Sequence, residues 1–142
     1  RKDVAHILGV LSGIKMIMSP FFKSVDIIIP IPLHPEKKAK RGYNQAAHFG
    51  KGISEVLELP LRENVIRKKI YTKSQTKMSR LERVQNVLHS FELQDKYSIQ
   101  GRHILIVDDV LTTGATIEAC AIKLQEAQNI KISIVTACIA RH

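Results

Sequence analysis

The sequence predicts an α/β protein with a central, mainly parallel sheet flanked by helices. Two short, continuously apolar runs, residues 26–31 and 103–108, are typical of strands that are buried on both faces of a parallel sheet. The second run is followed by a loop, a helical pattern and another apolar segment within about 35 residues, which is the spacing of a βαβ unit. Ligands of such sheets bind beyond the carboxyl ends of the strands, so the segments after these two runs are the first candidates for function.

Length and composition favour one soluble domain. The 142 residues, of which 44% are hydrophobic and 25% charged, suffice for one core and exclude wholesale disorder, a collagen-like chain and a coiled coil. The longest apolar run, residues 27–33, is interrupted by prolines and is too short to cross a bilayer, so we expect no membrane insertion. No charged-then-apolar leader opens the sequence. We therefore expect a fragment or processed piece without a secretion signal, and a cytoplasmic location.

Two helices separated by a strand and a loop are predicted in the first half of the chain. Apolar side chains at helical spacing favour an amphipathic helix over residues 3–18, ended by Ser19 and Pro20. These side chains are Val4, Ile7, Leu8, Leu11, Ile14 and Met18. Prolines after residue 29 cannot donate to a ladder, so the chain leaves the sheet there and a loop follows. Asn44 is suited to cap a helix that runs to about Leu57. Its buried stripe would consist of Ala46, Phe49, Ile53, Val56 and Leu57.

The second half of the chain contains a polar, lysine-rich stretch and the βαβ unit. We expect a short strand around residues 64–67, a mobile stretch without periodicity over 68–78, a short helix over 79–88 and a strand at Phe91 and Leu93. The βαβ unit comprises the strand 103–108, a loop over 109–116, a helix with Ile117, Cys120, Ala121 and Leu124 on one face, and the strand 131–138.

The net positive charge of the protein is confined to one region. Residues 37–83 contain thirteen lysines and arginines against four acids and so hold the whole net charge of +9. Such a regional excess fits an anionic ligand better than it fits general solubility. Four of these charges follow closely on the first predicted strand, namely Lys37, Lys38, Lys40 and Arg41.

The segment ILIVDDVLTTGAT, residues 104–116, combines the residue types that a sugar phosphate requires. Asp108 and Asp109 follow an apolar strand, where two carboxylates can accept hydrogen bonds from vicinal hydroxyls or lie near Mg²⁺. Three threonines and Gly114 come next, at the start of a helix whose free amides and dipole favour a phosphate. One short loop thus offers acceptors for a sugar and donors for a phosphate.

Two other interpretations of this segment stay open. The acids could merely end a strand while the threonines cap the next helix, although neighbouring carboxylates repel each other unless a cation or donors satisfy them. A Walker B strand also ends in Asp, but the chain contains no GxxxxGK[ST] motif to hold the phosphates of a nucleotide.

The same segment closely resembles the signature with which type I phosphoribosyltransferases bind phosphoribosyl pyrophosphate (PRPP). Further motifs are similar to those of the ComF family: PIPLHP at residues 30–35, RGYNQ at 41–45, TKSQ at 72–75, RVQN at 83–86, and Phe91. This resemblance covers residues 26–141. It implies a type I phosphoribosyltransferase fold in a single domain over residues 1–142, with a flexible basic hood near residues 67–90. The family also carries an N-terminal four-cysteine zinc module, for which we find no counterpart in these residues.

The resemblance also implies which residues form the site. Asp108 and Asp109 would take the ribose hydroxyls and Mg²⁺. The remaining substrate-binding loop would consist of Val110, Leu111, Thr112, Thr113, Gly114, Ala115 and Thr116, with its threonines and glycine on the 5-phosphate.

Basic segments correspond to the parts of the family that hold pyrophosphate. The loop over residues 33–41 matches the pyrophosphate loop, where Arg41 is the first candidate because guanidinium binds phosphate bidentately, and Lys37 and Lys38 are further candidates. The hood over residues 67–83 carries seven basic residues against one acid and contributes Gln75, Arg80 and Arg83. Ordinary solvated charges are the alternative for both segments.

Three functional hypotheses follow. The first is a phosphoribosyltransferase of nucleoside metabolism that binds PRPP with Mg²⁺ and transfers ribose 5-phosphate to a nitrogen acceptor, with release of pyrophosphate. The second is an accessory protein of DNA uptake that binds single-stranded DNA or competence proteins and keeps the PRPP pocket as a regulatory or vestigial anion site. Aromatic residues are only 5% of the chain, so stacking platforms for DNA are few. The third is a sensor that binds PRPP or another sugar phosphate without turning it over.

Overall fold

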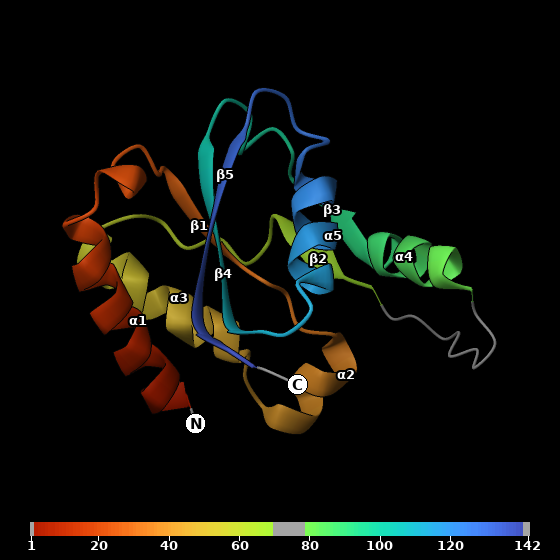
Figure 1. Cartoon of the computed structure of the whole chain (residues 1–142), viewed down its shortest axis with the longest axis horizontal. Coiled ribbons are helices and arrows are strands. Elements are labelled where there is room, and N and C mark those ends of the chain that lie inside the picture. The colour runs from red at the N-terminus through yellow and green to blue at the C-terminus, as the bar shows by residue number, and fades with distance from the viewer. Residues whose placement is uncertain (1, 70–78, 141–142) are drawn as a thin grey trace.

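A sheet of parallel strands forms the centre of the computed structural model, which describes residues 2–69 and 79–140. Its three strands are β1 (Ile27–Pro30), β4 (His103–Leu111) and β5 (Lys131–Ile139), with β4 between the other two (Figure 1). The register pairs Ile28 with Leu105, and Leu105 with Ser133. The predicted α/β class and parallel sheet are therefore confirmed.

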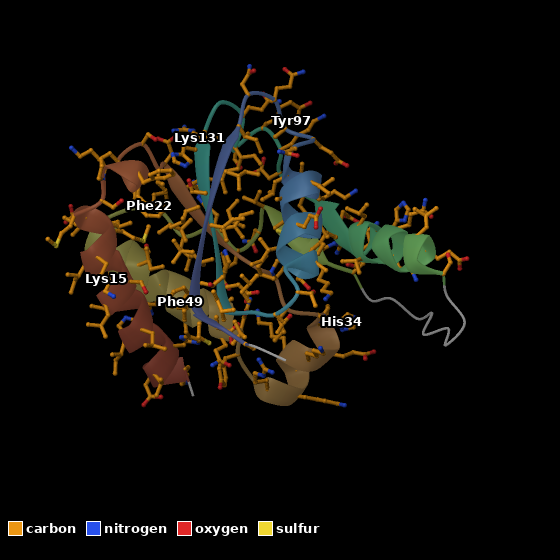
Figure 2. The ribbon with its side chains drawn as sticks, in the orientation of Figure 1. Lys15, Phe22, His34, Phe49, Tyr97 and Lys131 are labelled. Atoms are coloured by element: carbon orange, nitrogen blue, oxygen red, sulfur yellow. The ribbon has the colours of Figure 1, made fainter. Side chains whose placement is uncertain are left out.

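Alternation along β4 divides the core into two layers. Ile104 and Ile106 pack with α5 (Ala115–Leu124), whereas Leu105 and Val107 pack with α1 (Lys2–Ile17) and α3 (Gln45–Leu57). These four side chains are fully buried, and so is Phe49 of α3 (Figure 2). Each such burial stabilises the fold by about 1.5–3 kcal/mol. Helices therefore cover both faces of the sheet, as continuously apolar strands require.

Small residues form the face with which α1 packs against α3. Ala5, Gly9 and Gly13 are buried, and a Cβ atom at Gly9 would collide with the carbonyl oxygen of Phe49. The large apolar side chains predicted for this helix point away from the sheet, since Val4, Ile7, Leu8, Leu11, Ile14 and Met18 are between 41% and 84% exposed. The helix is present as predicted, but its glycines decide which face is buried because they let two backbones approach closely.

The expected loop over residues 33–41 is wrong for most of its length. Residues Pro35–Arg41 form the helix α2, which begins at the N-cap His34 and ends at Gly42 with φ of 82°. The Glu36 amide donates to Nδ1 of His34 at 3.2 Å. A proline in the first turn and a glycine after the last turn are helix-boundary signals, which the neighbouring prolines of the strand end obscured.

A small antiparallel unit lies beside the main sheet. It pairs β2 (Ile66–Lys68) with β3 (Phe91–Leu93), and α4 (Arg80–His89) precedes β3. The helix and β3 lie where the sequence predicts them, whereas β2 is displaced toward the C-terminus. Lys68 therefore belongs to a strand and not to the aperiodic stretch, of which residues 70–78 lie outside the described residues.

The central strand runs further than predicted. β4 continues through Asp108 to Leu111, and Leu111 pairs with Ile139 of β5. The expected loop over 109–116 therefore begins only after Leu111 and ends at Gly114, which caps α5 with φ of 81°.

A short 3-10 helix, η1 (Pro20–Phe22), follows α1. No helix within residues 2–69 and 79–140 is long and apolar enough to cross a membrane.

The close contact of α1 and α3 predicts an unequal response to two substitutions in α1. Gly9→Ala should lower the free energy of unfolding by about 1–3 kcal/mol, because the added methyl group has no space against Phe49. Leu11→Ala, in the exposed stripe, should cost less than about 1 kcal/mol. Urea denaturation of the two variants measures this difference. Equal losses would contradict the observed orientation of α1.

Candidate functional site

The two adjacent acids lie at the carboxyl end of β4, between the ends of β1 and β5. Asp108 follows Ile106 in the strand alternation and so projects toward the α5 side of the sheet, whereas Asp109 follows Val107 toward the α3 side. An oxygen of the Asp108 carboxylate accepts a hydrogen bond from the Asp109 amide at 2.9 Å. β4 thus places both carboxylates at the carboxyl end of the sheet, where ligands of parallel sheets bind.

A cavity of about 80 Å³ lies between Asp108 and the first turn of α5. It is lined by Asp108, Val110, Leu111, Thr112, Gly114, Thr116 and Ile117. Gly114 makes no side-chain cap, and the Ala115 amide donates to the Thr113 hydroxyl at 3.3 Å. The volume corresponds to about two or three water molecules, which suits one small anion. Hydroxyls and helix-terminal amides around it provide donors for a phosphate.

Asp108 is more basic than an ordinary carboxylate. Burial, followed by the neighbouring Asp109 carboxylate, raises the pKa of Asp108 from 3.8 to about 7, and Lys68 opposes the rise. Burial also raises the pKa of the Cys120 thiol on α5 to about 12, with Asp108 adding to the effect. A carboxyl group that is costly to ionise, at the edge of a sheet and next to a second acid, is typical of a functional site.

Lys68 lies within electrostatic range of Asp108. It comes from β2, and its ammonium group lies 5.7 Å from the centre of the Phe91 ring. Burial lowers the pKa of Lys68, and so does Lys37 of α2, while Asp108 raises it. These shifts place two lysines and one acid, from α2, β2 and β4, within electrostatic range of one another. Segments far apart in the sequence thus contribute charged groups to this end of the sheet.

A larger cavity of about 540 Å³ adjoins this cluster. Its lining comes from the end of β1, from α2, from residues 63–64 and from β2, and includes Pro30, Pro32, Leu33, Lys38, Lys68 and Lys69. Apolar and basic groups thus share one wall. The cavity is large enough for a charged group of several atoms beside the smaller phosphate-sized cavity.

The predicted site residues are only partly brought together. Asp108, Val110, Leu111, Thr112, Gly114 and Thr116 line the small cavity, and Lys38 lines the large one. Asp109, Thr113 and Ala115 adjoin the small cavity in sequence without lining it, and Lys37 lies near Lys68. Arg41 is exposed in the last turn of α2 and lines neither cavity.

Three further candidates cannot be placed in the site. Arg83 belongs to α4, but its side chain and that of Arg80 are not described, and Gln75 lies outside the described residues. The residue that sequence reasoning did not single out is Lys68, because it stands in a run of lysines. Its signal was its position two residues after the buried Ile66, because the alternation of a strand puts Lys68 on the same face as Ile66 and the intervening Arg67 on the other.

The family follows from comparison with known proteins. Residues 44–142 match the family model described as phosphoribosyl transferase domain. This match covers more than half of the chain, so the protein belongs to the phosphoribosyltransferase domain family. The predicted type I phosphoribosyltransferase fold is likewise confirmed.

Curated relatives confirm the resemblance to the ComF family. Competence protein F of Haemophilus influenzae is 35% identical over 96 residues, which are 67% of this chain and 42% of that protein. Competence protein ComFC of Bacillus subtilis is 34% identical over 95 residues, or 67% of this chain and 36% of that protein. DNA utilization protein YhgH of Escherichia coli K12 is 32% identical over 96 residues, which are 68% of this chain and 41% of that protein. The aligned part is thus well under half the length of each relative.

Solved structures share the fold. Glutamine PRPP amidotransferase from B. subtilis, complexed with ADP and GMP, superposes with a TM-score of 0.66 at 17% identity, over 96% of this chain and 26% of that one. Adenine phosphoribosyltransferase from Saccharomyces cerevisiae gives a TM-score of 0.57 at 14% identity, over 92% of this chain and 66% of that one. At these identities the likeness establishes the fold alone.

The environment of Asp108 predicts how stability depends on pH. Because its pKa rises from 3.8 to about 7 on folding, the folded protein keeps a proton that the unfolded chain has lost between these values. The free energy of unfolding should therefore fall as the pH rises from about 4 to about 8, and Asp108→Asn should remove this component. Thermal melting at pH 5 and pH 8 tests it.

The comparison of wild type with Asp108→Asn separates the contribution of Asp108 to the pH dependence of stability from that of the histidines. Burial lowers the pKa of His48 and of His103, so their contributions have the opposite sign, but both histidines are present in the two proteins. An identical change in melting temperature between pH 5 and pH 8 for wild type and Asp108→Asn would contradict the raised pKa.

Proposed function

We propose that this domain binds PRPP as its Mg²⁺ complex at the carboxyl end of β4. Asp108 and Asp109 would accept hydrogen bonds from the ribose hydroxyls. The loop from Thr112 to Thr116 would hold the 5-phosphate with its amides and hydroxyls. Lysines beside the 540 Å³ cavity would hold the pyrophosphate. The ribose, the 5-phosphate and the pyrophosphate would then each face groups of complementary chemistry at the carboxyl end of the sheet.

The 80 Å³ cavity under Asp108 carries this proposal. If the threonines served only to cap α5, one hydroxyl would suffice, and Thr113 already accepts from the Ala115 amide. Thr112 and Thr116 line the hollow instead. A hollow lined by hydroxyls at a helix start, beside two acids and near two lysines, favours a phosphorylated ligand over a purely structural turn.

Mg²⁺ fits this site as part of the ligand complex. No group of three or more His, Cys, Asp or Glu side chains that could hold a metal occurs among residues 2–69 and 79–140. Mg²⁺ often binds through one or two carboxylates together with substrate phosphates, and the Asp108–Asp109 pair suits that mode. When bound, the ion would neutralise charge on the pyrophosphate.

Transfer to a nitrogen acceptor would need orientation more than acid–base chemistry. The bond from ribose C1 to the pyrophosphate oxygen would break, a bond from C1 to the acceptor nitrogen would form, and the acceptor would lose its proton to water. Lys68 and Lys37 would stabilise the charge that develops on the departing pyrophosphate. Asp108 and Asp109 would fix the ribose for displacement. A sensor that binds PRPP without this step would use the same contacts.

A second candidate function is the handling of single-stranded DNA in the cytoplasm, alone or with competence proteins. The observation that favours it is the confinement of the net charge of +9 to residues 37–83. Relatives named competence protein and DNA utilization protein agree with this role. The PRPP site would then serve as a regulatory or vestigial anion site on the same domain.

Neutralising either acid should weaken the sugar-phosphate complex. Asp108→Asn or Asp109→Asn should raise the Kd for Mg²⁺·PRPP by more than about tenfold, because each removes a charged acceptor for the ribose or the ion. Asp3→Asn, on the exposed part of α1, is the matched control and should leave the Kd unchanged. Isothermal titration calorimetry measures all three. Wild-type affinity in both site variants would refute the assignment.

Salt dependence tests the DNA hypothesis. If six phosphates are contacted, affinity for a single-stranded oligonucleotide should fall by roughly 300-fold between 50 and 200 mM salt, because binding releases counterions condensed on the strand. Fluorescence anisotropy with labelled oligothymidylate gives the slope. A flat response would exclude a backbone-contacting mode.

A further inference from the structure

A third cavity, of about 310 Å³, lies at the turn between α2 and α3. It is lined by Lys38, Gly42, Tyr43, Asn44, Ala47, His48, Lys51, Leu61 and Glu63. Three of these residues, Lys38, Asn44 and Glu63, also line the 540 Å³ cavity. None of the residues from Asp108 to Thr116 contributes to it. The cavity therefore adjoins the proposed PRPP site but is separate from the part that would hold the ribose phosphate.

An aromatic pair forms one wall of this cavity. The rings of Tyr43 and His48 meet edge to face, with their centroids 5.6 Å apart and an angle of 75° between their planes. Both side chains are half-buried. Since only 5% of the residues are aromatic and Trp is absent, a paired aromatic wall beside lysines is a rare feature of this chain. Such a wall can accept the flat face of a nucleobase.

The electrostatics of the cavity favour a ligand with an anionic part and a neutral ring. Burial lowers the pKa of His48, and the charges of Lys2 and Lys51 lower it further, so the imidazole is neutral near pH 7. Lys38 and Lys51 supply positive charge at the cavity itself. Glu63 provides a carboxylate that can accept hydrogen bonds from exocyclic amino groups.

We propose that this cavity binds one nucleotide unit, with the base against Tyr43 and His48 and the phosphate at Lys38 and Lys51. The two cavities share Lys38, so successive phosphates of one strand could occupy both. A single strand is therefore the favoured source of the nucleotide, and in this respect the inference rests on the proposed handling of single-stranded DNA. A free mononucleotide has the same chemistry and is the other source.

The test compares three variants with controls from the far end of the molecule. Tyr43→Leu, His48→Leu and Lys51→Gln each alter one element of the cavity. Tyr97→Leu and Lys131→Gln are matched controls, because both side chains are exposed and lie at the end of the sheet opposite α2 (Figure 2). Binding is measured by anisotropy with a labelled twelve-residue oligothymidylate and by calorimetry with thymidine monophosphate. Thermal melting shows that each variant is folded.

Loss of stacking should dominate the result. We expect Tyr43→Leu to weaken oligothymidylate binding by about tenfold, as alanine substitutions of stacking residues do. Lys51→Gln should weaken it by about threefold to tenfold and reduce the salt slope by about one. Both controls should bind as the wild type does. Because Lys51 is exposed, its variant tests the proposal even if Tyr43→Leu fails to fold.

Different outcomes distinguish failure of the cavity assignment from failure of the proposed handling of single-stranded DNA. If the wild type binds the oligonucleotide and the Tyr43 and Lys51 variants bind it equally well, the cavity assignment is overturned while DNA handling stands. If only the mononucleotide binds, and the variants lose it, the cavity is supported and the strand is excluded as its source. If neither ligand binds the wild type, the inference is overturned. Calorimetry with Mg²⁺·PRPP should give wild-type affinity for Lys51→Gln in every case.

Discussion

The position of β4 between two parallel partners is the constraint on which the site depends. Because β1 and β5 flank β4 on both sides, residues Ile104 to Val107 are fully buried, and β4 turns polar only beyond Val107, where its pairing with β1 ends and its pairing with β5 continues. Asp108 and Asp109 are placed at that point. Neighbouring carboxylates are unfavourable there without donors or cations, and β2 and α2 bring Lys68 and Lys37 to the same edge.

The α1–α3 layer and the basic cavities share one helix, α3. The α1–α3 layer packs through glycines and small side chains, and leaves the larger apolar residues of α1 exposed. Lysines from α2, α3 and β2 lie around two adjoining cavities, so α3 packs against α1 and also contributes to one cavity wall. Under the proposed function an anion binds beside these cavities, while the packing of α1 against α3 holds α3 in place on the strands.

The sequence was most informative where apolar pattern and chemistry coincide. Continuous apolar runs predicted β1 and β4, and the acid–threonine–glycine order after β4 predicted a phosphate-sized site at the start of α5. It was least informative where tertiary contacts decide. The burial of Gly9 and not Leu11 depends on the backbone of α3, and the approach of Lys68 to Asp108 depends on the pairing of β2 with β3. Small residues do recur at every fourth position of α1, at Ala5, Gly9 and Gly13, but the apolar stripe beside them is the stronger pattern and gave the wrong buried face.

Our central proposal is that Asp108, whose pKa burial raises, accepts hydrogen bonds from the ribose of a Mg²⁺-bound sugar phosphate, which favours its charged form. Carboxyl-carbon NMR of Asp108, followed through a pH titration with and without saturating Mg²⁺·PRPP, tests it most directly. The account predicts a pKa of about 7 without ligand and a clearly lower pKa with it. A midpoint that saturating ligand leaves unchanged would contradict the account.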